Sequence, residues 1–230
     1  MEGIRLGGEI PDFMCETTEG DFGFYEFLVS EVDRPWTLLF SHPADFTPVC
    51  TTEFGRTEKI LDRFTELGIK LIGVSCDEIS DHHLWSKDIL YREGLEDQAQ
   101  LRFPIIADKS REIVTKLGML DPREISQPGM PLPARAVMLL DKRGVIRLAV
   151  LYPAAVGRSY EEILRASEAV ILNDRTGLAT PVEWTPGEEC LVPASMTLVE
   201  AENKFGKVQT ETLPSGKEYM RKVKYPQNLF

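Results

Sequence analysis

A predicted strand, a loop and a predicted helix meet within residues 36–67, and this junction constrains the fold more than any other stretch. The apolar run Trp36-Thr37-Leu38-Leu39-Phe40 is typical of a buried strand. A helical pattern follows, and its apolar face is formed by Phe54, Ile60, Leu61, Phe64 and Leu67. We therefore expect an α/β unit in which the intervening loop leaves the carboxyl end of a strand.

Cys50 is predicted to lie in the first turn of this helix. Thr47 can cap the helix, and Pro48 suits its first position. Free backbone N–H groups and the positive end of the helix dipole meet in that turn and stabilise a thiolate. The same position also suits a small buried side chain, and burial favours the neutral thiol. The local pattern leaves both interpretations open, a reactive nucleophile and a structural cysteine.

The composition is that of an ordinary globular chain and excludes several classes of protein. Hydrophobic residues make up 43% and charged residues 27% of the 230 positions, a length that allows one large domain or a domain with a small appendage. The net charge of −11 argues against a nucleic-acid partner and against attraction to an anionic membrane. We expect no secretory signal in residues 1–9 and no membrane span, because no uncharged apolar run is long enough.

The four cysteines, Cys15, Cys50, Cys76 and Cys190, are widely scattered and form no Cys-x-x-Cys pair. This spacing argues against zinc ribbons and against thioredoxin-type redox motifs. Scattered cysteines in a chain of this size do not predict a disulfide scaffold, so we expect a reducing compartment and a cytoplasmic location. Cys15 and Cys76 are interpreted as small strand residues, and Cys190 as part of a linker.

Strand and helix patterns alternate through most of the chain. Strands are expected at 36–40, 70–76 and 103–107 and in a hairpin of 136–140 and 145–151, and helices at 50–67, 80–93, 112–117 and 160–173. A hairpin-like opening is expected within residues 1–35, and a loop over the proline-containing residues 119–134. This order predicts a layered α/β sandwich.

The composition changes after about residue 173. Residues 174–230 carry few periodic apolar positions, with one helix expected at 194–205 and one strand at 217–224. A segment of this kind buries little surface alone. We therefore expect a domain at 1–173 and an arm at 174–230 that packs on the domain or on a partner subunit.

The segment around Cys50 resembles the active-site segment of peroxiredoxins, which carries a Pro-x-x-x-Thr-x-x-Cys core. Here the core reads Pro43-Ala44-Asp45-Phe46-Thr47-Pro48-Val49-Cys50, and its flanks Ser41-His42 and Thr51-Thr52-Glu53 resemble the 1-Cys, or peroxiredoxin-6-like, subfamily. Residues 132–137, 151–158 and 180–188 are similar to further segments of the family. The resemblance implies a thioredoxin-like fold and a small C-terminal dimerisation arm.

The resemblance also implies three catalytic residues. Cys50 is expected to attack a peroxide oxygen and become a sulfenic acid, and Thr47 to hydrogen-bond the peroxide. A lone arginine before a strand would more often be solvated, but Arg135 matches the arginine that contacts the thiolate in the family. Its guanidinium would stabilise charge in the transition state.

Four residues are expected to support this site. Arg158 matches a family arginine that pairs with the glutamate here numbered Glu53. Pro43 is the first residue of the Pro-x-x-x-Thr-x-x-Cys core, and His42 is expected to tune the thiolate or the entrance used by the reductant. Taken alone, Arg158 would be read as a surface residue and His42 as a structural one.

Two other features predict no additional chemistry. His82 and His83 are adjacent, so their side chains diverge on a helix, and both are interpreted as residues of a surface helix. We therefore expect no metal site and no cofactor. Ser30 lacks the flanking glycines of a Gly-x-Ser-x-Gly motif, so the phospholipase activity of some relatives is not expected.

The resemblance implies a thiol-dependent peroxidase that reduces hydrogen peroxide and small organic hydroperoxides. The expected reductant is an external thiol of the glutathione or thioredoxin type, and the expected assembly is a homodimer or higher homo-oligomer. Cys190 would resolve Cys50 only if the arm reaches it. The alternative is a non-enzymatic peroxide sensor or chaperone-like protein that relays oxidation to a partner through a mixed disulfide, since both need an accessible thiolate.

Overall fold

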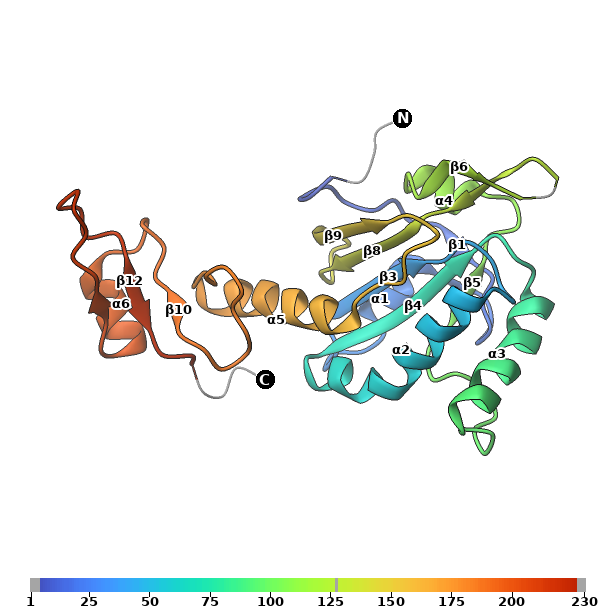
Figure 1. Cartoon of the computed structure of the whole chain (residues 1–230), viewed down its shortest axis with the longest axis horizontal. Coiled ribbons are helices and arrows are strands. Elements are labelled where there is room, and N and C mark those ends of the chain that lie inside the picture. The colour runs from blue at the N-terminus through green and yellow to red at the C-terminus, as the bar shows by residue number, and fades with distance from the viewer. Residues whose placement is uncertain (1–4, 127, 227–230) are drawn as a thin grey trace. The chain divides into compact units, whose positions relative to one another are not determined.

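The computed structural model describes residues 5–126 and 128–226. The chain divides into two compact units, Met1–Tyr160 and Glu161–Phe230 (Figure 1). Within the described part of the chain, no helix combines the length and the apolar character needed to cross a membrane.

A five-stranded sheet forms the centre of the first unit. Its strands follow the order β5-β4-β3-β8-β9, with β3, β4 and β5 parallel to one another and β8 antiparallel to both of its neighbours. The bounds are Trp36–Ser41 for β3, Ile69–Ser75 for β4, Ile105–Ala107 for β5, Arg135–Leu140 for β8 and Ile146–Tyr152 for β9. Every residue of β3, β4 and β8 is buried, which explains their continuous apolar runs. The predicted strands and hairpin are confirmed, although β5 is shorter than expected.

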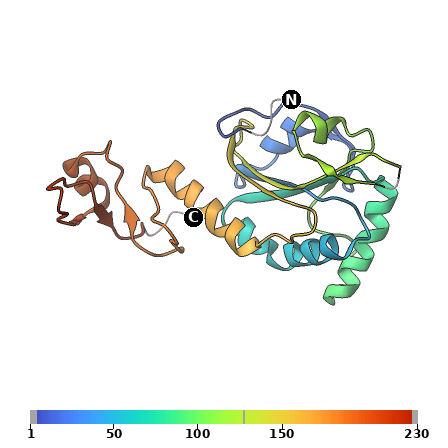
Figure 2. The same ribbon diagram turned by 45° about the horizontal axis from the view of Figure 1, so that its top comes forward.

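Helices cover both faces of this sheet, so the predicted layered sandwich is confirmed. Figure 2 shows α2 and α3 on one face and α1 and α4 on the other. Their bounds are Phe24–Val29 for α1, Pro48–Glu66 for α2, Ile79–Glu93 for α3 and Glu112–Lys116 for α4. The helices predicted at 50–67, 80–93 and 112–117 are therefore present with small shifts at their ends.

The two faces of the sheet have different cores. On the face under α1 and α4 the strands contribute aliphatic side chains, including Leu39, Ile72, Val74, Met138 and Leu140, and the buried Phe24 belongs to the same cluster. Aromatic rings fill the opposite face, where the ring of Phe54 from α2 lies 5.2 Å from Phe40 and 4.8 Å from Trp85 of α3. A fully buried Phe side chain contributes about 2 kcal/mol, so this packing holds α2, and with it Cys50, against the sheet.

Two segments outside the central sheet form small hairpins. In the N-terminal segment, β1 (Met14–Cys15) pairs with β2 (Phe22–Gly23), as predicted. The prediction of a loop over 119–134 is wrong, because β6 (Leu120–Ile125) and β7 (Pro131–Pro133) form an antiparallel pair. Prolines are tolerated in a two-stranded pair, where each strand has an edge that needs no N–H donor. Residue 127, between these strands, lies outside the described residues.

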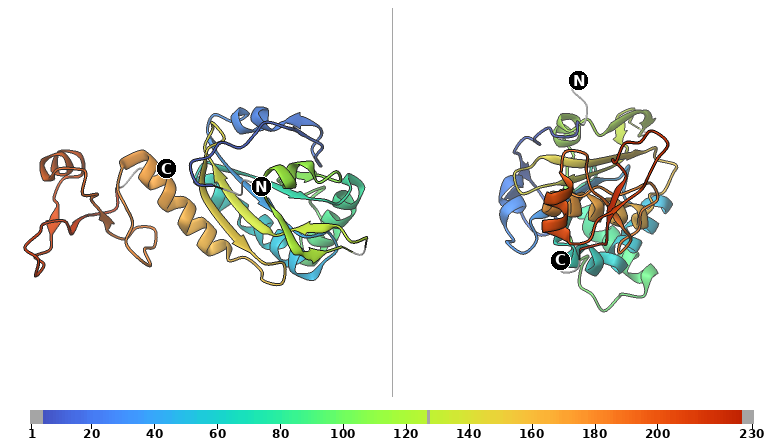
Figure 3. Two further views of the ribbon diagram at one scale, coloured as in Figure 1. Left: turned by 90° about the horizontal axis from the view of Figure 1, so that it is seen from above. Right: turned by 90° about the vertical axis from the view of Figure 1, so that its left-hand side faces the viewer.

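The second unit contains two helices and a small sheet, coloured orange to red in Figure 3. The elements are α5 (Tyr160–Thr176, whose first residue still belongs to the first unit), β10 (Cys190–Leu191), α6 (Leu198–Phe205), β11 (Gln209–Thr210) and β12 (Arg221–Val223), with sheet order β10-β12-β11. Buried apolar side chains form a core of its own: Leu172, Leu178, Trp184, Cys190, Val192, Ala201 and Val223. Residues 174–230 thus bury more apolar surface than their weak periodicity suggests, and Cys190 lies in a strand rather than in a linker.

Candidate active site

Cys50 is the third residue of α2, which begins where the loop after β3 ends. Thr47 occupies the cap position and Pro48 the first helical position, as predicted. The Thr47 hydroxyl makes no capping bond, however, and instead donates to the Ala44 carbonyl at 2.8 Å. Its oxygen keeps lone pairs that can accept the hydrogen of a hydroperoxide.

Arg135 meets Cys50 because β8 runs antiparallel to β3. This pairing brings the beginning of β8 beside the end of β3, where the loop to Cys50 starts. The Arg135 Nη1 lies 3.3 Å from the Cys50 Sγ, and both side chains are buried. Nε and Nη2 of Arg135 donate to the Ala154 carbonyl at 2.8 and 2.6 Å, which fixes the guanidinium in place. A buried guanidinium at this distance favours the thiolate over the thiol.

Glu53, one turn after Cys50, joins two buried arginines. Its Oε2 accepts from Arg135 Nη1 at 2.9 Å and from Arg158 Nη2 at 2.6 Å, and its Oε1 accepts from the Arg158 backbone N–H at 2.7 Å. The Arg158 Nη1 also donates to the carbonyls of Ser41 and Ala136 at 2.9 and 3.1 Å. The predicted contact of Arg135 with Cys50 and the predicted pair of Arg158 with Glu53 are both present.

The buried group beside Cys50 holds more positive than negative side chains. Two guanidinium cations face one carboxylate, Glu53, which leaves an excess positive charge beside the Cys50 sulfur. Burial opposes the ionisation of Glu53, but the charge and hydrogen bonds of Arg158, together with the charge of Arg135, outweigh it and hold the pKa of Glu53 below its ordinary value. This excess positive charge can stabilise negative charge that develops next to the Cys50 sulfur.

The other three cysteines lie in surroundings that favour the thiol. Burial raises the pKa of Cys15 and of Cys76 to about 12 and the pKa of Cys190 to about 11. Cys15 lies in β1, as interpreted from the sequence, whereas Cys76 follows the end of β4 and is only half-buried. Cys50 differs from these three in its surroundings, because a buried guanidinium N–H, from Arg135 Nη1, lies 3.3 Å from its sulfur.

His42 and Pro43 are buried at the start of the loop before Cys50. The Nε2 of His42 lies 2.7 Å from Asp45 Oδ1, and its ring stacks on Trp85 at 5.1 Å between ring centres. Burial lowers the pKa of His42, although Asp45 acts in the opposite direction. His42 thus faces Asp45 in this structure, and its predicted influence on the thiolate stays a prediction.

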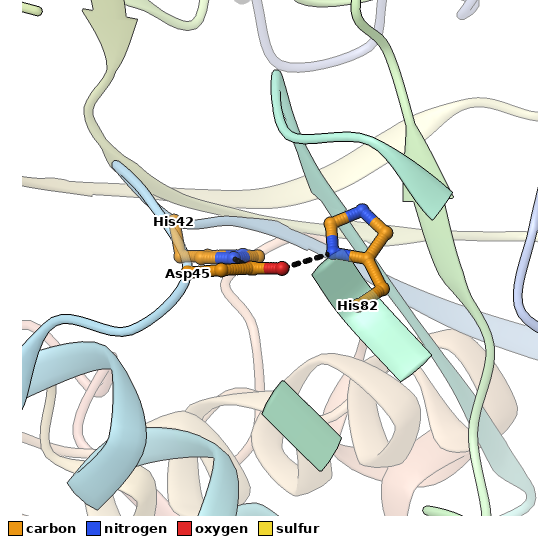
Figure 4. A group of neighbouring side chains, drawn as sticks. All are labelled: His42, Asp45 and His82. Carbon is orange, nitrogen blue, oxygen red and sulfur yellow. Dashed lines mark hydrogen bonds and ion pairs between the residues drawn. The ribbon is translucent and has the colours of Figure 1, made fainter. Parts of the chain in front are cut away.

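The interpretation of His82 as a surface residue is wrong. His83 is exposed, but His82 is fully buried on the inner face of α3 and approaches Asp45 Oδ2 with its Nδ1 at 2.6 Å (Figure 4). Adjacent helical residues diverge, so one of the two histidines points inward, and the inward position is three residues before the buried Trp85. The three-residue spacing from His82 to Trp85 is the sequence feature from which the inward direction of His82 could have been predicted. Among the described residues, His42, Asp45 and His82 form the group whose donor atoms lie close enough for a metal ion, but these atoms are already hydrogen-bonded to one another.

Comparison with known proteins identifies the family. Residues 6–149 match the AhpC/TSA family, and residues 169–207 match the C-terminal domain of 1-Cys peroxiredoxin. The chain is 45% identical to peroxiredoxin-6 of Gallus gallus over 228 residues, which cover 99% of this chain and 100% of that protein. The chain belongs to the peroxiredoxins. It is also 42% identical to the 1-Cys peroxiredoxin of Onchocerca volvulus over 227 residues, which cover 96% of this chain and 97% of that one.

Solved peroxiredoxin structures have the same fold. A cysteine-to-serine mutant of peroxiredoxin 6 from Arenicola marina aligns with a TM-score of 0.92 and 40% identity, covering 98% of this chain and 100% of that one. A yeast mitochondrial 1-Cys peroxiredoxin aligns with a TM-score of 0.82 and 34% identity, covering 96% of this chain and 100% of that one. The thioredoxin-like fold and the 1-Cys, peroxiredoxin-6-like subfamily are therefore confirmed. This peroxiredoxin is a thiol-dependent peroxidase, an oxidoreductase that acts on peroxides with a thiol reductant, and the non-enzymatic alternative is not favoured.

Proposed function

We propose that Cys50 is the nucleophile of this peroxidase and that Thr47 and Arg135 hold the peroxide and the thiolate. The Cys50 thiolate attacks the terminal oxygen of a hydroperoxide, ROOH. The S–O bond forms while the O–O bond breaks, which gives Cys–SOH and an alkoxide that takes up one proton and leaves as ROH. With hydrogen peroxide the leaving product is water.

The observation that carries this proposal is the 3.3 Å contact between Arg135 Nη1 and the Cys50 sulfur. The same guanidinium can stabilise the charge that develops on the departing oxygen. Thr47 can accept the hydrogen of the peroxide while its own hydrogen stays on the Ala44 carbonyl. Glu53 and Arg158 hold the side chain of Arg135 in a fixed position relative to α2. We assign His42 and Pro43 to the support of the loop before Cys50.

We further propose an external thiol as the reductant. The first thiol, R′SH, converts Cys–SOH into the mixed disulfide Cys–S–SR′ and water, and a second one releases the Cys50 thiol and R′SSR′. Two observations support this route. Burial raises the pKa of Cys190 to about 11, so this thiol is a poor resolving nucleophile. The yeast mitochondrial relative is described as being resolved by glutathione/thioredoxin systems, which supports a reductant of that type here.

We infer that the molecule is a homodimer, in which residues 1–173 act as the peroxidase domain and residues 174–230 as the arm. The match of residues 169–207 to the C-terminal domain of 1-Cys peroxiredoxin supports the arm. The edge strand β9 offers a second contact surface, since Leu151 on it is 59% exposed. All four cysteines are free, which supports the proposed cytoplasmic location.

Intact mass spectrometry after one equivalent of hydrogen peroxide tests the role of Cys50. We expect the parent protein to gain one oxygen, or to form an adduct with a sulfenic-acid trap, and Cys50→Ser to do neither. Cys190→Ser is the matched control and should react like the parent. A loss of two hydrogens in the parent that disappears in Cys190→Ser would show an internal disulfide and contradict the external reductant. Equal slow oxidation of parent and Cys50→Ser would overturn the assignment of Cys50.

Sedimentation tests the dimer. We expect the parent to sediment as a dimer and Leu151→Glu, which places a charge on the exposed edge of β9, to shift toward the monomer. Leu84→Glu, on an exposed position of α3 (56% exposed), is the control and should sediment like the parent. A dimer that is equally stable in both variants would exclude the edge of β9 as the contact surface, and a monomeric parent would overturn the dimer itself.

A further inference from the structure

Asp45 is the centre of a buried network that the proposed chemistry does not use. Its two carboxylate oxygens face two histidines, with Oδ1 2.7 Å from His42 Nε2 and Oδ2 2.6 Å from His82 Nδ1 (Figure 4). The second ring nitrogen of His82, Nε2, lies 3.2 Å from the Ile106 carbonyl in β5. All three side chains are buried, so solvent screens these contacts very little.

The acceptors around this network determine where its protons lie. A carboxylate and a carbonyl can only accept, so both ring nitrogens of His82 must carry hydrogen when Asp45 is ionised. His42 needs hydrogen only on Nε2, because its buried Nδ1 has no hydrogen-bond partner among the described residues. With these hydrogens in place, each of the three contacts joins a ring N–H to an acceptor oxygen.

Asp45 lies in the loop that leads to the proposed active site. Its backbone N–H donates to Asp77 Oδ2 at 3.0 Å, so Asp77 holds the backbone of Asp45 while His82 of α3 holds its side chain. The next residue, Phe46, has a φ of 54°, which is unfavourable for a residue with a side chain. Strained backbone persists only where its surroundings hold it, and Thr47 comes directly after the strained position.

The inner face of α3 also contacts the other side of this loop. Trp85, one turn after His82, donates its Nε1–H to Thr51 Oγ1 at 3.0 Å and stacks on His42. Thr51 belongs to the first turn of α2, next to Cys50. The chain is therefore attached to α3 on both sides of Phe46, in the loop at Asp45 and in the first turn of α2 at Thr51.

We propose that His82 is a positioning residue for the peroxidase reaction. Held between Asp45 and the Ile106 carbonyl, it fixes the loop from Pro43 to Thr47 and thereby the place of the Thr47 hydroxyl relative to the Cys50 sulfur. This inference rests on the proposed roles of Cys50 and Thr47. It assigns no contact with the peroxide to His82 itself.

Two amide substitutions separate the contacts of His82. The amide nitrogen in His82→Asn takes the place of Nδ1 and keeps a donor for Asp45, whereas the amide nitrogen in His82→Gln takes the place of Nε2 and keeps the donor for Ile106. We expect His82→Gln to lower the rate of Cys50 oxidation by hydrogen peroxide about tenfold or more, because a small misplacement of a positioning group is costly. His82→Asn should retain most of the rate. His83→Gln, on the exposed neighbour, is the control and should match the parent.

Alkylation of Cys50 by iodoacetamide distinguishes positioning of the peroxide from damage to the thiol or the fold. Alkylation needs a thiolate but no peroxide-binding hydroxyl, so its rate in His82→Gln should stay close to that of the parent. Equal losses of peroxide rate in the Asn and Gln variants would overturn the proposal, as would a parallel loss of the alkylation and peroxide rates. Failure of the proposed function itself would look different, because Cys50→Ser would then still reduce peroxide.

Nitrogen-15 NMR of the parent protein provides a test that needs no variant at the buried site. The chain has only three histidines, and the exposed His83 serves as an internal reference. We expect ring N–H signals from both nitrogens of His82, because each lies against an acceptor oxygen, and from one nitrogen of His42. An unprotonated ring nitrogen in His82, or loss of its ring-proton signals on stoichiometric addition of zinc, would overturn the proposed arrangement.

Discussion

Glu53 is the residue on which the electrostatics of the site depend. It is the one carboxylate that both Arg135 and Arg158 contact within the described chain, and it lies on α2 one turn from Cys50. Its removal would leave two buried guanidinium groups next to each other with only the thiolate to balance them. A change at Glu53 is therefore expected to affect both the stability of the fold and the surroundings of Cys50.

Glu53→Gln is expected to destabilise the protein by about 3 kcal/mol at neutral pH, because breaking a buried ion pair leaves uncompensated charge. The same change removes the anchor of Arg135 on α2, so the rate of Cys50 oxidation by hydrogen peroxide should fall as well. Urea unfolding and stopped-flow oxidation measure the two effects. Glu162→Gln, which removes a surface partner of Arg165, is the control and should change neither measurement by much.

The effect of Glu53→Gln should depend on pH. The pKa of Glu53 lies below its ordinary value of 4.5 in the folded protein, so its charge contributes stability that is complete above this value. That contribution is lost as the pH falls through the pKa of the folded state. The difference in unfolding free energy between parent and variant should therefore shrink below pH 4.5, and a constant difference across this range would contradict the account.

At the scale of elements, the position of α2 depends on how closely it approaches β4. Gly73 in β4 has no side chain, and a Cβ atom built there would lie 3.2 Å from the Cζ of Phe54. The Phe54 ring is fully buried and contacts the rings of Phe40, Trp85 and Phe103. The glycine thus lets the helix that carries Cys50 pack closely on the sheet.

Gly73→Ala is expected to destabilise the first unit by about 1–3 kcal/mol, because the buried Phe54 ring has little room to move. Urea unfolding measures the loss. Phe54→Leu in the same background shortens the opposing side chain, so the double variant should be more stable than the sum of the two single losses predicts. Strict additivity of the two losses would show that the alanine does not press on Phe54.

At the scale of the whole molecule, the chain forms two units with separate cores. The proposed catalytic and supporting residues all lie between Ser41 and Arg158, within the first unit. Trp184 is the largest fully buried side chain of the second core. The first chemical step is therefore expected to depend on the first unit.

Trp184→Ala tests this separation of roles. We expect the local stability of the second unit to fall by about 3–5 kcal/mol, which hydrogen exchange detects as faster exchange of its amide protons. The rate of Cys50 oxidation by hydrogen peroxide should stay near that of the parent. Trp85→Ala is the matched variant in the first unit and should lower that rate, since Trp85 contacts Thr51 and His42. Equal losses of rate in both variants would contradict the separation.

The sequence by itself determined the order of the main strands and helices and the position of Cys50 in the first turn of α2. These features follow from local periodicity, from Pro48 and from the apolar runs, which depend on near neighbours in the chain. Arg135 and Arg158 were found through the similarity of their segments to a known family. Arg135 and Cys50 are 85 positions apart in the sequence, and Arg158 and Glu53 are 105 positions apart. No local pattern shows that such distant residues come into contact.

The tertiary structure decided these contacts, because Arg135 depends on the antiparallel pairing of β8 with β3, and Arg158 comes after β9, which pairs with β8. It also decided which of two adjacent histidines points inward, since the direction of His82 depends on what α3 packs against. The hairpin of β6 and β7 and the second core escaped prediction for a related reason. Their stabilising contacts join residues without a regular spacing, so only the folded chain brings them together.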